Sequence, residues 1–198
     1  MQSLGLSSET KRSDGWLKSL LWPSVENAWD VDYLGQQGMW VCTVVAVFTL
    51  VTTVFSGVPI AIFLGVFSAL FYVIGGMGVR EANWPAAAIV FSVYVLDILY
   101  TVASLHIPSI FTIAFAIVLF SNLRSTFLAA EWKPSSEGED RPTRFSESFS
   151  DKYVDQMPRI LWPKLQIPFI VLGVAMLLFS LVGVGLVLAR RFGVLPHG

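Results

Sequence analysis

Residues 39–78 read MWVCTVVAVFTLVTTVFSGVPIAIFLGVFSALFYVIGGMG, two apolar runs separated only by Ser56, Gly57, Val58 and Pro59. A hydrocarbon core of roughly 30 Å needs about 20 helical residues at 1.5 Å each, so each run is long enough to cross a membrane. One unbroken helix over the whole stretch would reach roughly 60 Å, twice the thickness of that core. Glycine and proline at the centre favour a reversal of the chain. The stretch therefore predicts a transmembrane helical hairpin.

Three further tracts are as long and as apolar as these two runs. The 198-residue chain is 55% hydrophobic and 14% charged, with a mean hydropathy of +0.67, whereas a soluble domain is usually about 25% charged. We predict an all-α, polytopic transmembrane bundle, an integral membrane protein with about five spans. The spans are expected near 39–56, 58–78, 84–104, 108–130 and 166–189.

The N-terminal segment, residues 1–38, is predicted to be cytoplasmic and partly interfacial. Its GWLKSLLWP sequence at 15–23 places Trp16, Leu17 and Leu20 near helical spacing before Pro23. Such a helix would lie in the headgroup region. The first 38 residues contain no signal-peptide pattern, so the first span is expected to direct insertion.

After the four-span bundle at 39–130, a cytoplasmic loop is predicted at 131–164, followed by the fifth span and a short tail at 165–198. The loop opens with KPSSEGEDRP, a composition that cannot bury a core. An amphipathic helix is then expected near 145–157, because four large side chains recur every four residues. These candidate docking residues are Phe145, Phe149, Tyr153 and Met157.

The stripe formed by these four residues has three possible contacts: the membrane, its own bundle, or a protein partner. Glu147, Asp151 and Asp155 lie close to only one basic residue, Lys152. This local excess of acid disfavours an anionic leaflet. Docking on protein, within the chain or between chains, is therefore the interpretation that the charge count favours.

The distribution of basic residues predicts the orientation, because Lys and Arg resist translocation. With a cytoplasmic N-terminus, all Lys and Arg residues except Arg190 and Arg191 lie inside or at the inner interface. We therefore predict an N-terminus inside and a C-terminus outside. The Arg190–Arg191 pair is the main evidence against this orientation.

Asp97 stands in the apolar sequence VYVLDILYTVASLH at 93–106. It lies about 13 residues beyond Trp84, roughly 20 Å from the inner boundary. Helical spacing places Tyr94 and Thr101 on its face. The same depth count on the neighbouring spans reaches three hydroxyl residues, Thr52, Thr53 and Ser180. These six residues form the predicted intramembrane polar site.

Two roles remain open for Asp97. A charge at this depth costs about 2.5–3.5 kcal/mol on insertion scales, so a carboxyl here must find partners or stay protonated. It either holds helices together through hydrogen bonds or serves as a proton or cation site.

The chain has no residue pattern typical of an enzyme. Its two histidines, His106 and His197, cannot form a transmembrane bis-histidine haem site or an HExxH motif. GxSxG, GxGxxG and P-loop patterns are absent from the sequence, as are paired intramembrane carboxylates. We expect a non-enzymatic protein without a cofactor or metal. A net charge of −1 argues against nucleic-acid binding.

Two stretches, GMGVREANWPAAAIVFSVYVLDILY at 76–100 and LFSNLRSTFLAAEW at 119–132, carry a resemblance. Over roughly residues 58–132 the chain resembles small bacterial polytopic inner-membrane proteins of unknown function. The resemblance implies a multi-span bundle in a bacterial inner membrane and no activity.

The sequence favours an accessory or scaffold component of a membrane complex, with a protein partner or a second copy of the chain. The alternative is a small proton- or cation-coupled transporter or channel that uses Asp97. Five spans without visible inverted repeats are few for a monomeric secondary transporter.

Overall fold

The computed structural model describes residues 14–133, 144 and 147–192, and every regular element in these ranges is helical. Five of its helices are long and apolar enough to cross a membrane. The predicted all-α bundle of about five spans is therefore confirmed. The elements are α1 (Trp16–Leu21), α2 (Ala28–Phe55), α3 (Pro59–Arg80), α4 (Trp84–Ala103), α5 (Ile110–Glu131), α6 (Phe149–Asp151), the π-helical η2 (Lys152–Gln156) and α7 (Met157–Arg191).

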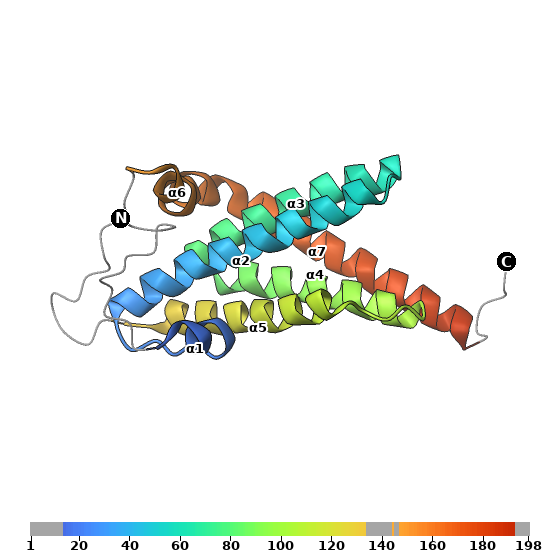
Figure 1. Cartoon of the computed structure of the whole chain (residues 1–198), viewed down its shortest axis with the longest axis horizontal. Coiled ribbons are helices and arrows are strands. Elements are labelled where there is room, and N and C mark those ends of the chain that lie inside the picture. Colours follow the sequence, from blue (N-terminus) through green and yellow to red (C-terminus); the bar gives the residue numbers. More distant parts are fainter. Residues whose placement is uncertain (1–13, 134–143, 145–146, 193–198) are drawn as a thin grey trace.

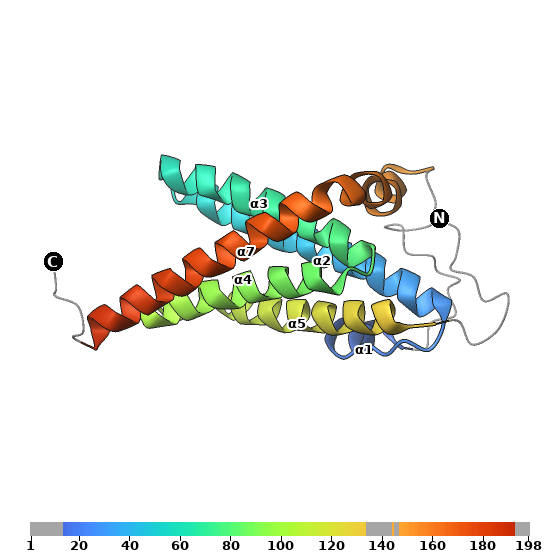
Figure 2. The ribbon, with the colours of Figure 1, turned by 180° about the vertical axis from the view of Figure 1, so that it is seen from behind.

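The α2–α3 hairpin packs against the other long helices over part of its length and diverges from α4, α5 and the end of α7 at its turn (Figure 1). The α2–α3 hairpin runs obliquely to α4 and α5, so its turn lies away from their ends. Helix α7 contacts both α3 and α4 as it crosses the molecule, which is seen best from behind (Figure 2). We call the half that holds α1, Arg80 and η2 the proximal half. The half that holds the α2–α3 turn and Leu105 is the distal half.

Helix α2 begins at Ala28, well before the predicted start of the first span at 39. The side chain of Asn27 accepts a hydrogen bond from the Asp30 amide, which caps the helix. Hydropathy alone placed the start too late, because the first turns of α2 are polar and yet buried. Two of these polar side chains contact neighbouring elements: Asp32 pairs with Arg80 of α3, and Gln37 donates to the Ser19 carbonyl of α1.

The segment before the last span is continuous with that span. Helical structure runs from Phe149 to Arg191 through α6, η2 and α7, with Pro163 and Pro168 inside α7. Ser148 and Asp151 form a reciprocal capping box at its start. Phe145, the first residue of the predicted amphipathic helix, lies outside the described residues.

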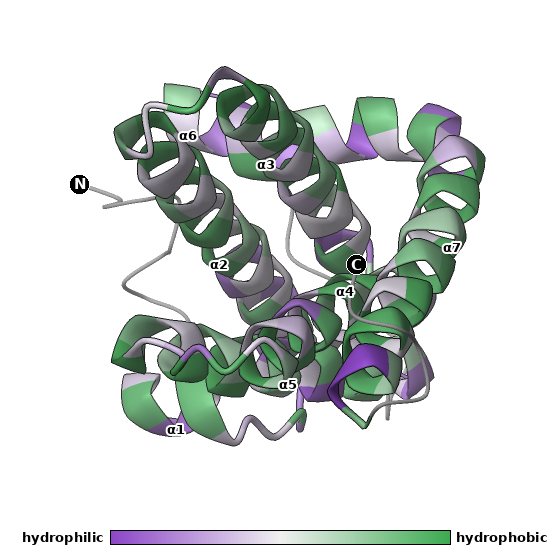
Figure 3. Cartoon of the chain, turned by 90° about the vertical axis from the view of Figure 1, so that its right-hand side faces the viewer, coloured by the Kyte–Doolittle hydropathy of each residue, from purple (hydrophilic) through white to green (hydrophobic). Residues whose placement is uncertain are grey.

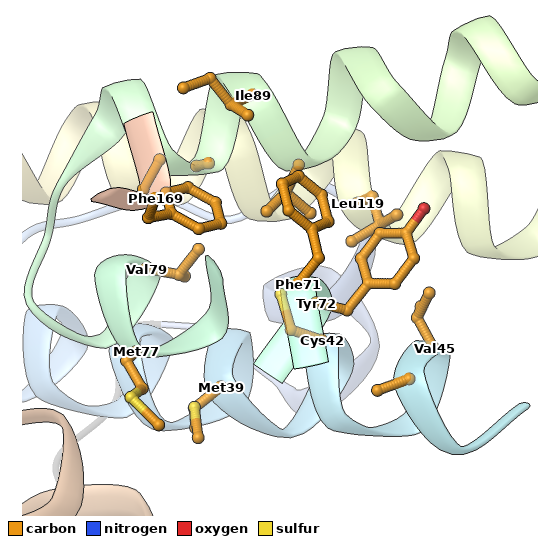
Figure 4. Close-up of a cluster of buried hydrophobic side chains, with 14 of the residues drawn as sticks. Met39, Cys42, Val45, Phe71, Tyr72, Met77, Val79, Ile89, Leu119 and Phe169 are labelled. Carbon is orange, nitrogen blue, oxygen red and sulfur yellow. The ribbon is translucent and has the colours of Figure 1, made fainter. Parts of the chain in front are cut away.

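The core lies mainly in the proximal half and joins α2, α3, α4, α5 and α7 (Figure 4). The Phe71 ring stacks on Phe169 of α7 with centroids 5.1 Å apart. Close approach requires glycine on α3: a Cβ at Gly78 would lie 2.6 Å from the Trp162 ring and 2.5 Å from the Ala86 side chain. Small residues therefore bring α3, α4 and α7 into contact here.

The distal half buries little. Phe55, the last residue of α2, is 86% exposed, and Ile107, in the connection between α4 and α5, is 93% exposed. The residues of the long helices are predominantly hydrophobic (Figure 3), and many of their large apolar side chains are exposed. An apolar surface of this extent fits a lipid environment rather than water.

Candidate functional site

A buried guanidinium, that of Arg80, lies at the end of α3. Arg80 is 4% exposed. Its Nη2 lies 2.6 Å from Asp32 Oδ1 of α2 and 2.5 Å from Asp155 Oδ1 of η2. Its Nε donates to the same Asp155 oxygen at 3.1 Å. One arginine therefore ties three elements together at the proximal end.

A second ion pair extends this proximal network. Arg144 donates to both carboxylate oxygens of Glu81, at 2.5 Å and 3.2 Å, and to the Asp155 carbonyl at 3.4 Å. The bidentate geometry fixes the orientation of Arg144. Residues of both pairs line a cavity of about 30 Å³ with Ser125 and Thr126. This volume suits a single water molecule.

The network depends on a small residue in α2. A Cβ at Gly35 would lie 3.0 Å from Arg80 Nη1 and 3.2 Å from the Arg80 carbonyl. The sequence analysis treated Arg80 only as one of the inner basic residues and missed its two acidic partners. The available signal was Asp32, which lies one helical turn before Gly35 and so on its face. Asp155 gave no comparable signal.

The side chains of the predicted docking stripe point in different directions. Tyr153 turns toward the bundle, where its hydroxyl lies 2.7 Å from Thr43 Oγ1 and its ring is 5.6 Å from Trp40. Met157 also packs against the core. Phe149 is 85% exposed. The stripe is therefore divided between the bundle and the surface.

Asp97 lies in the distal half, on an exposed part of α4. Within the described ranges its carboxylate has no hydrogen bond or ion pair, and only its carbonyl accepts one, from Thr101 Oγ1 at 2.9 Å. It lines a cavity of about 320 Å³ between α4 and α7. The other lining residues are Leu96, Tyr100, Phe179, Ser180 and Gly183.

Of the other predicted site residues, only Ser180 shares this cavity with Asp97. Tyr94 is buried and donates to the Thr112 carbonyl of α5 at 3.3 Å. Thr52 and Thr53 donate to α2 carbonyls, at 3.0 Å to Phe48 and 3.0 Å to Thr49. The hydroxyls of α2 are thus satisfied by their own helix.

Gly65 explains where Thr53 points. A Cβ on Gly65 would overlap Thr53 Oγ1, so the threonine packs directly on the glycine backbone of α3. The sequence predicted the depth of Thr53 along its span. It did not predict the rotation of α2 about its axis, which decides the neighbour that Thr53 faces. The polar layer is consequently divided: Thr53 faces α3, whereas Asp97 and Ser180 line a separate cavity.

Helix α1 covers the side of α5 near the proximal end. Trp22 stacks over the Arg124 guanidinium at 4.4 Å, a cation–π contact. Asp14 accepts hydrogen bonds from Lys18 at 2.5 Å and from the Ser24 amide at 2.8 Å. Burial raises the pKa of Asp14, but these hydrogen bonds outweigh it and leave the pKa below its usual value of 3.8.

The described residues contain no group of three or more His, Cys, Asp or Glu side chains that could hold a metal ion. The length and apolar composition of the five long helices are those of an integral membrane protein. Comparison of the chain with protein-family models, curated proteins and solved structures gave no match.

Proposed function

We propose that the protein is a non-enzymatic subunit of a membrane complex and that another transmembrane helix covers the cavity at Asp97. The observation that carries this proposal is an exposed carboxyl in the distal half with no partner among the described residues. A polar group left unsatisfied in hydrocarbon costs several kcal/mol by order of magnitude. A donor from a second chain removes that cost.

The shape of the cavity suits a helix that approaches between α4 and α7. Ser180 and Gly183 are small, and a Cβ at Gly183 would meet only the Tyr100 ring, at 4.0 Å. Small residues let a neighbouring helix come close. The partner is expected to present a hydrogen-bond donor or a basic group at the depth of Asp97, supplied by another protein or by a second copy of this chain.

The proximal half is a weaker candidate for this contact. Asp32, Asp155 and Glu81 already have arginine partners there, and Tyr153 is hydrogen bonded. We therefore place the main protein contact at the distal cavity rather than on the 145–157 stripe.

The test compares the size of the native complex in mild detergent for wild type and two variants. Asp97→Leu removes the carboxyl and should release the partner, so the complex becomes smaller. Thr52→Val is the matched control, because Thr52 is exposed at the distal end and hydrogen bonds only to its own helix. A complex that keeps its size in Asp97→Leu would contradict the proposal.

A proton- or cation-coupled transporter is the second candidate. It is favoured by the carboxylate of Asp97 and the hydroxyl of Ser180 lining one cavity, because both groups offer oxygen ligands to a cation. In proteoliposomes this function requires a proton or sodium flux that Asp97→Asn abolishes without unfolding the bundle. Wild-type flux of this kind would replace the subunit proposal.

We further propose a bacterial inner-membrane location with a cytoplasmic N-terminus. The described residues support it with eight basic residues in the proximal half, against Arg190 and Arg191 at the distal end of α7. The eight are Lys18, Arg80, Arg124, Lys133, Arg144, Lys152, Arg159 and Lys164. In intact cells, Lys133→Cys should resist a membrane-impermeant maleimide, and Phe192→Cys should react. The reverse labelling would invert the orientation.

A further inference from the structure

The outward face of the helical run from Ser148 to Lys164 is basic, although its sequence is rich in acid. Asp151 is buried and accepts a hydrogen bond from the Ser148 amide at 3.0 Å. Asp155 is 1% exposed and faces Arg80. Lys152 and Lys164 are exposed. The local acidic excess counted along the sequence is therefore turned inward, away from this surface.

A second basic side chain strengthens this asymmetry. Arg159 is exposed between the two lysines, and Glu147 is the single exposed acidic residue among the described positions 147–164. Three positive charges therefore stand against one negative charge on the surface. The argument that charge repels this segment from an anionic leaflet no longer holds.

An apolar cavity opens beside these charges. It measures about 490 Å³, and the only charged residue among those that line it is Lys152. Phe149 and Ile160 are both exposed. The lining residues are Phe149, Lys152, Tyr153, Gln156, Met157, Ile160 and Leu161.

The cavity lies where a lipid headgroup would be expected. In the proximal half, α6 and η2 lie across the end of the bundle before α7 turns into its apolar part (Figure 1). Lys152, Gln156 and Ile160 line the cavity one after another along this run, and Lys164 follows about one α-helical turn after Ile160. A cation, an apolar cavity and a second cation are thus aligned along the entry to the span.

We propose that this surface binds a phospholipid with an anionic headgroup. The phosphate pairs with Lys152, with Lys164 and Arg159 nearby, and an acyl chain occupies the cavity against Phe149 and Ile160. Charge complementarity selects this occupant, because basic residues at an interface attract anionic lipids. The site is independent of whatever covers Asp97.

The test is native mass spectrometry of the delipidated full chain, titrated with dioleoyl phosphatidylglycerol or dioleoyl phosphatidylcholine. Wild type should bind the phosphatidylglycerol more tightly. Lys152→Gln should weaken that binding about fivefold and leave phosphatidylcholine binding unchanged, because one basic residue near the surface contributes on the order of this factor. Lys133→Gln is the charge-matched control and should change neither.

Phe149→Ser tests the apolar part, with Phe192→Ser as a control because Phe192 is exposed at the distal end of α7. Phe149→Ser should weaken binding of both lipids, and Phe192→Ser should not. Equal binding of the two lipids by wild type, or equal losses in Lys152→Gln and Lys133→Gln, would overturn the proposal. So would a co-purified protein that is lost in Phe149→Ser while the lipid preference remains.

Discussion

The two halves of the bundle differ in whether their charged side chains are paired. In the proximal half Arg80 is buried between two carboxylates and Arg144 is paired with Glu81. In the distal half the carboxyl of Asp97 lines an open cavity and has no partner among the described residues. The helices follow the same division, since they pack around a core proximally and the α2–α3 hairpin diverges from the others distally.

The paired charges of the proximal half stabilise the fold, whereas the carboxyl of Asp97 in the distal half is available to bind another molecule. Buried charges that are already paired hold the proximal elements together, and removing one partner leaves the other uncompensated. An exposed carboxyl in an apolar surface contributes little to its own fold and is free to bind another molecule. Variants in the two halves should therefore have opposite effects on stability and assembly.

The largest expected effect is at the proximal network. Arg80→Met leaves the buried Asp155 and the half-buried Asp32 without their cation and should cost about 3–5 kcal/mol in free energy of unfolding. Thermal unfolding in detergent measures the loss. Arg159→Gln, which removes an exposed arginine, should have almost no effect. Equal effects of the two variants would break the comparison between buried and exposed charge.

Substitutions at glycines should also destabilise the proximal half more than the distal half, with a smaller loss of unfolding free energy. Gly78→Val places side-chain atoms where Trp162 and Ala86 already lie and should cost about 1–3 kcal/mol. Gly185→Val is the distal control, because a Cβ there meets nothing within 4 Å. Its unfolding temperature in detergent should match wild type. If Gly185→Val lowered the unfolding temperature as much as Gly78→Val, the distal part of α7 would have to be packed against other helices.

A smaller effect is expected at the hydrogen bond that joins η2 to α2. Tyr153→Phe removes the hydroxyl that contacts Thr43 and should cost about 0.5–1.5 kcal/mol. Tyr100→Phe is the distal control, since the Tyr100 hydroxyl has no hydrogen bond among the described residues. Chemical unfolding in detergent distinguishes the two. If Tyr153→Phe is neutral, η2 is held by the ion pairs alone.

The smallest effect concerns Asp14, which holds the start of α1. Its pKa is lowered in the folded protein, so its contribution is present above the unfolded value and is lost as the pH falls through the folded value. The stability difference between wild type and Asp14→Asn should therefore be constant near neutral pH and shrink below pH 3.8. Unfolding measured from pH 6 to pH 3 checks this. A difference that grows as the pH falls would contradict the assigned contacts.

Hydropathy could predict the number and approximate place of the spans, because apolar length alone decides which tracts can cross a membrane. It could not predict the early start of α2, since the half-buried Asp32 carboxylate depends on its ion pair with Arg80. That contact links positions far apart in the chain and depends on how α2 and α3 rotate about their axes.

The same limit applies to the candidate site. Depth counting placed Asp97 and Ser180 in one layer of six residues, and these two line one cavity. It could not show that Thr53 packs on Gly65, because the rotation of α2 follows from its contacts with α3. Similarly, counting charges along 147–155 could not show that Asp151 and Asp155 face inward.

Photocrosslinking in native membranes tests most directly whether the distal cavity is completed by another chain. A photoreactive phenylalanine analogue at Tyr100 would line the cavity, and the same analogue at Ile113 would lie on the exposed surface of α5 near the same end. Tyr100 should give a protein adduct of one defined mass that disappears when Asp97→Leu is added, and Ile113 should give lipid adducts alone. Lipid adducts alone at both positions, or a protein adduct at Tyr100 that survives Asp97→Leu, would contradict the account.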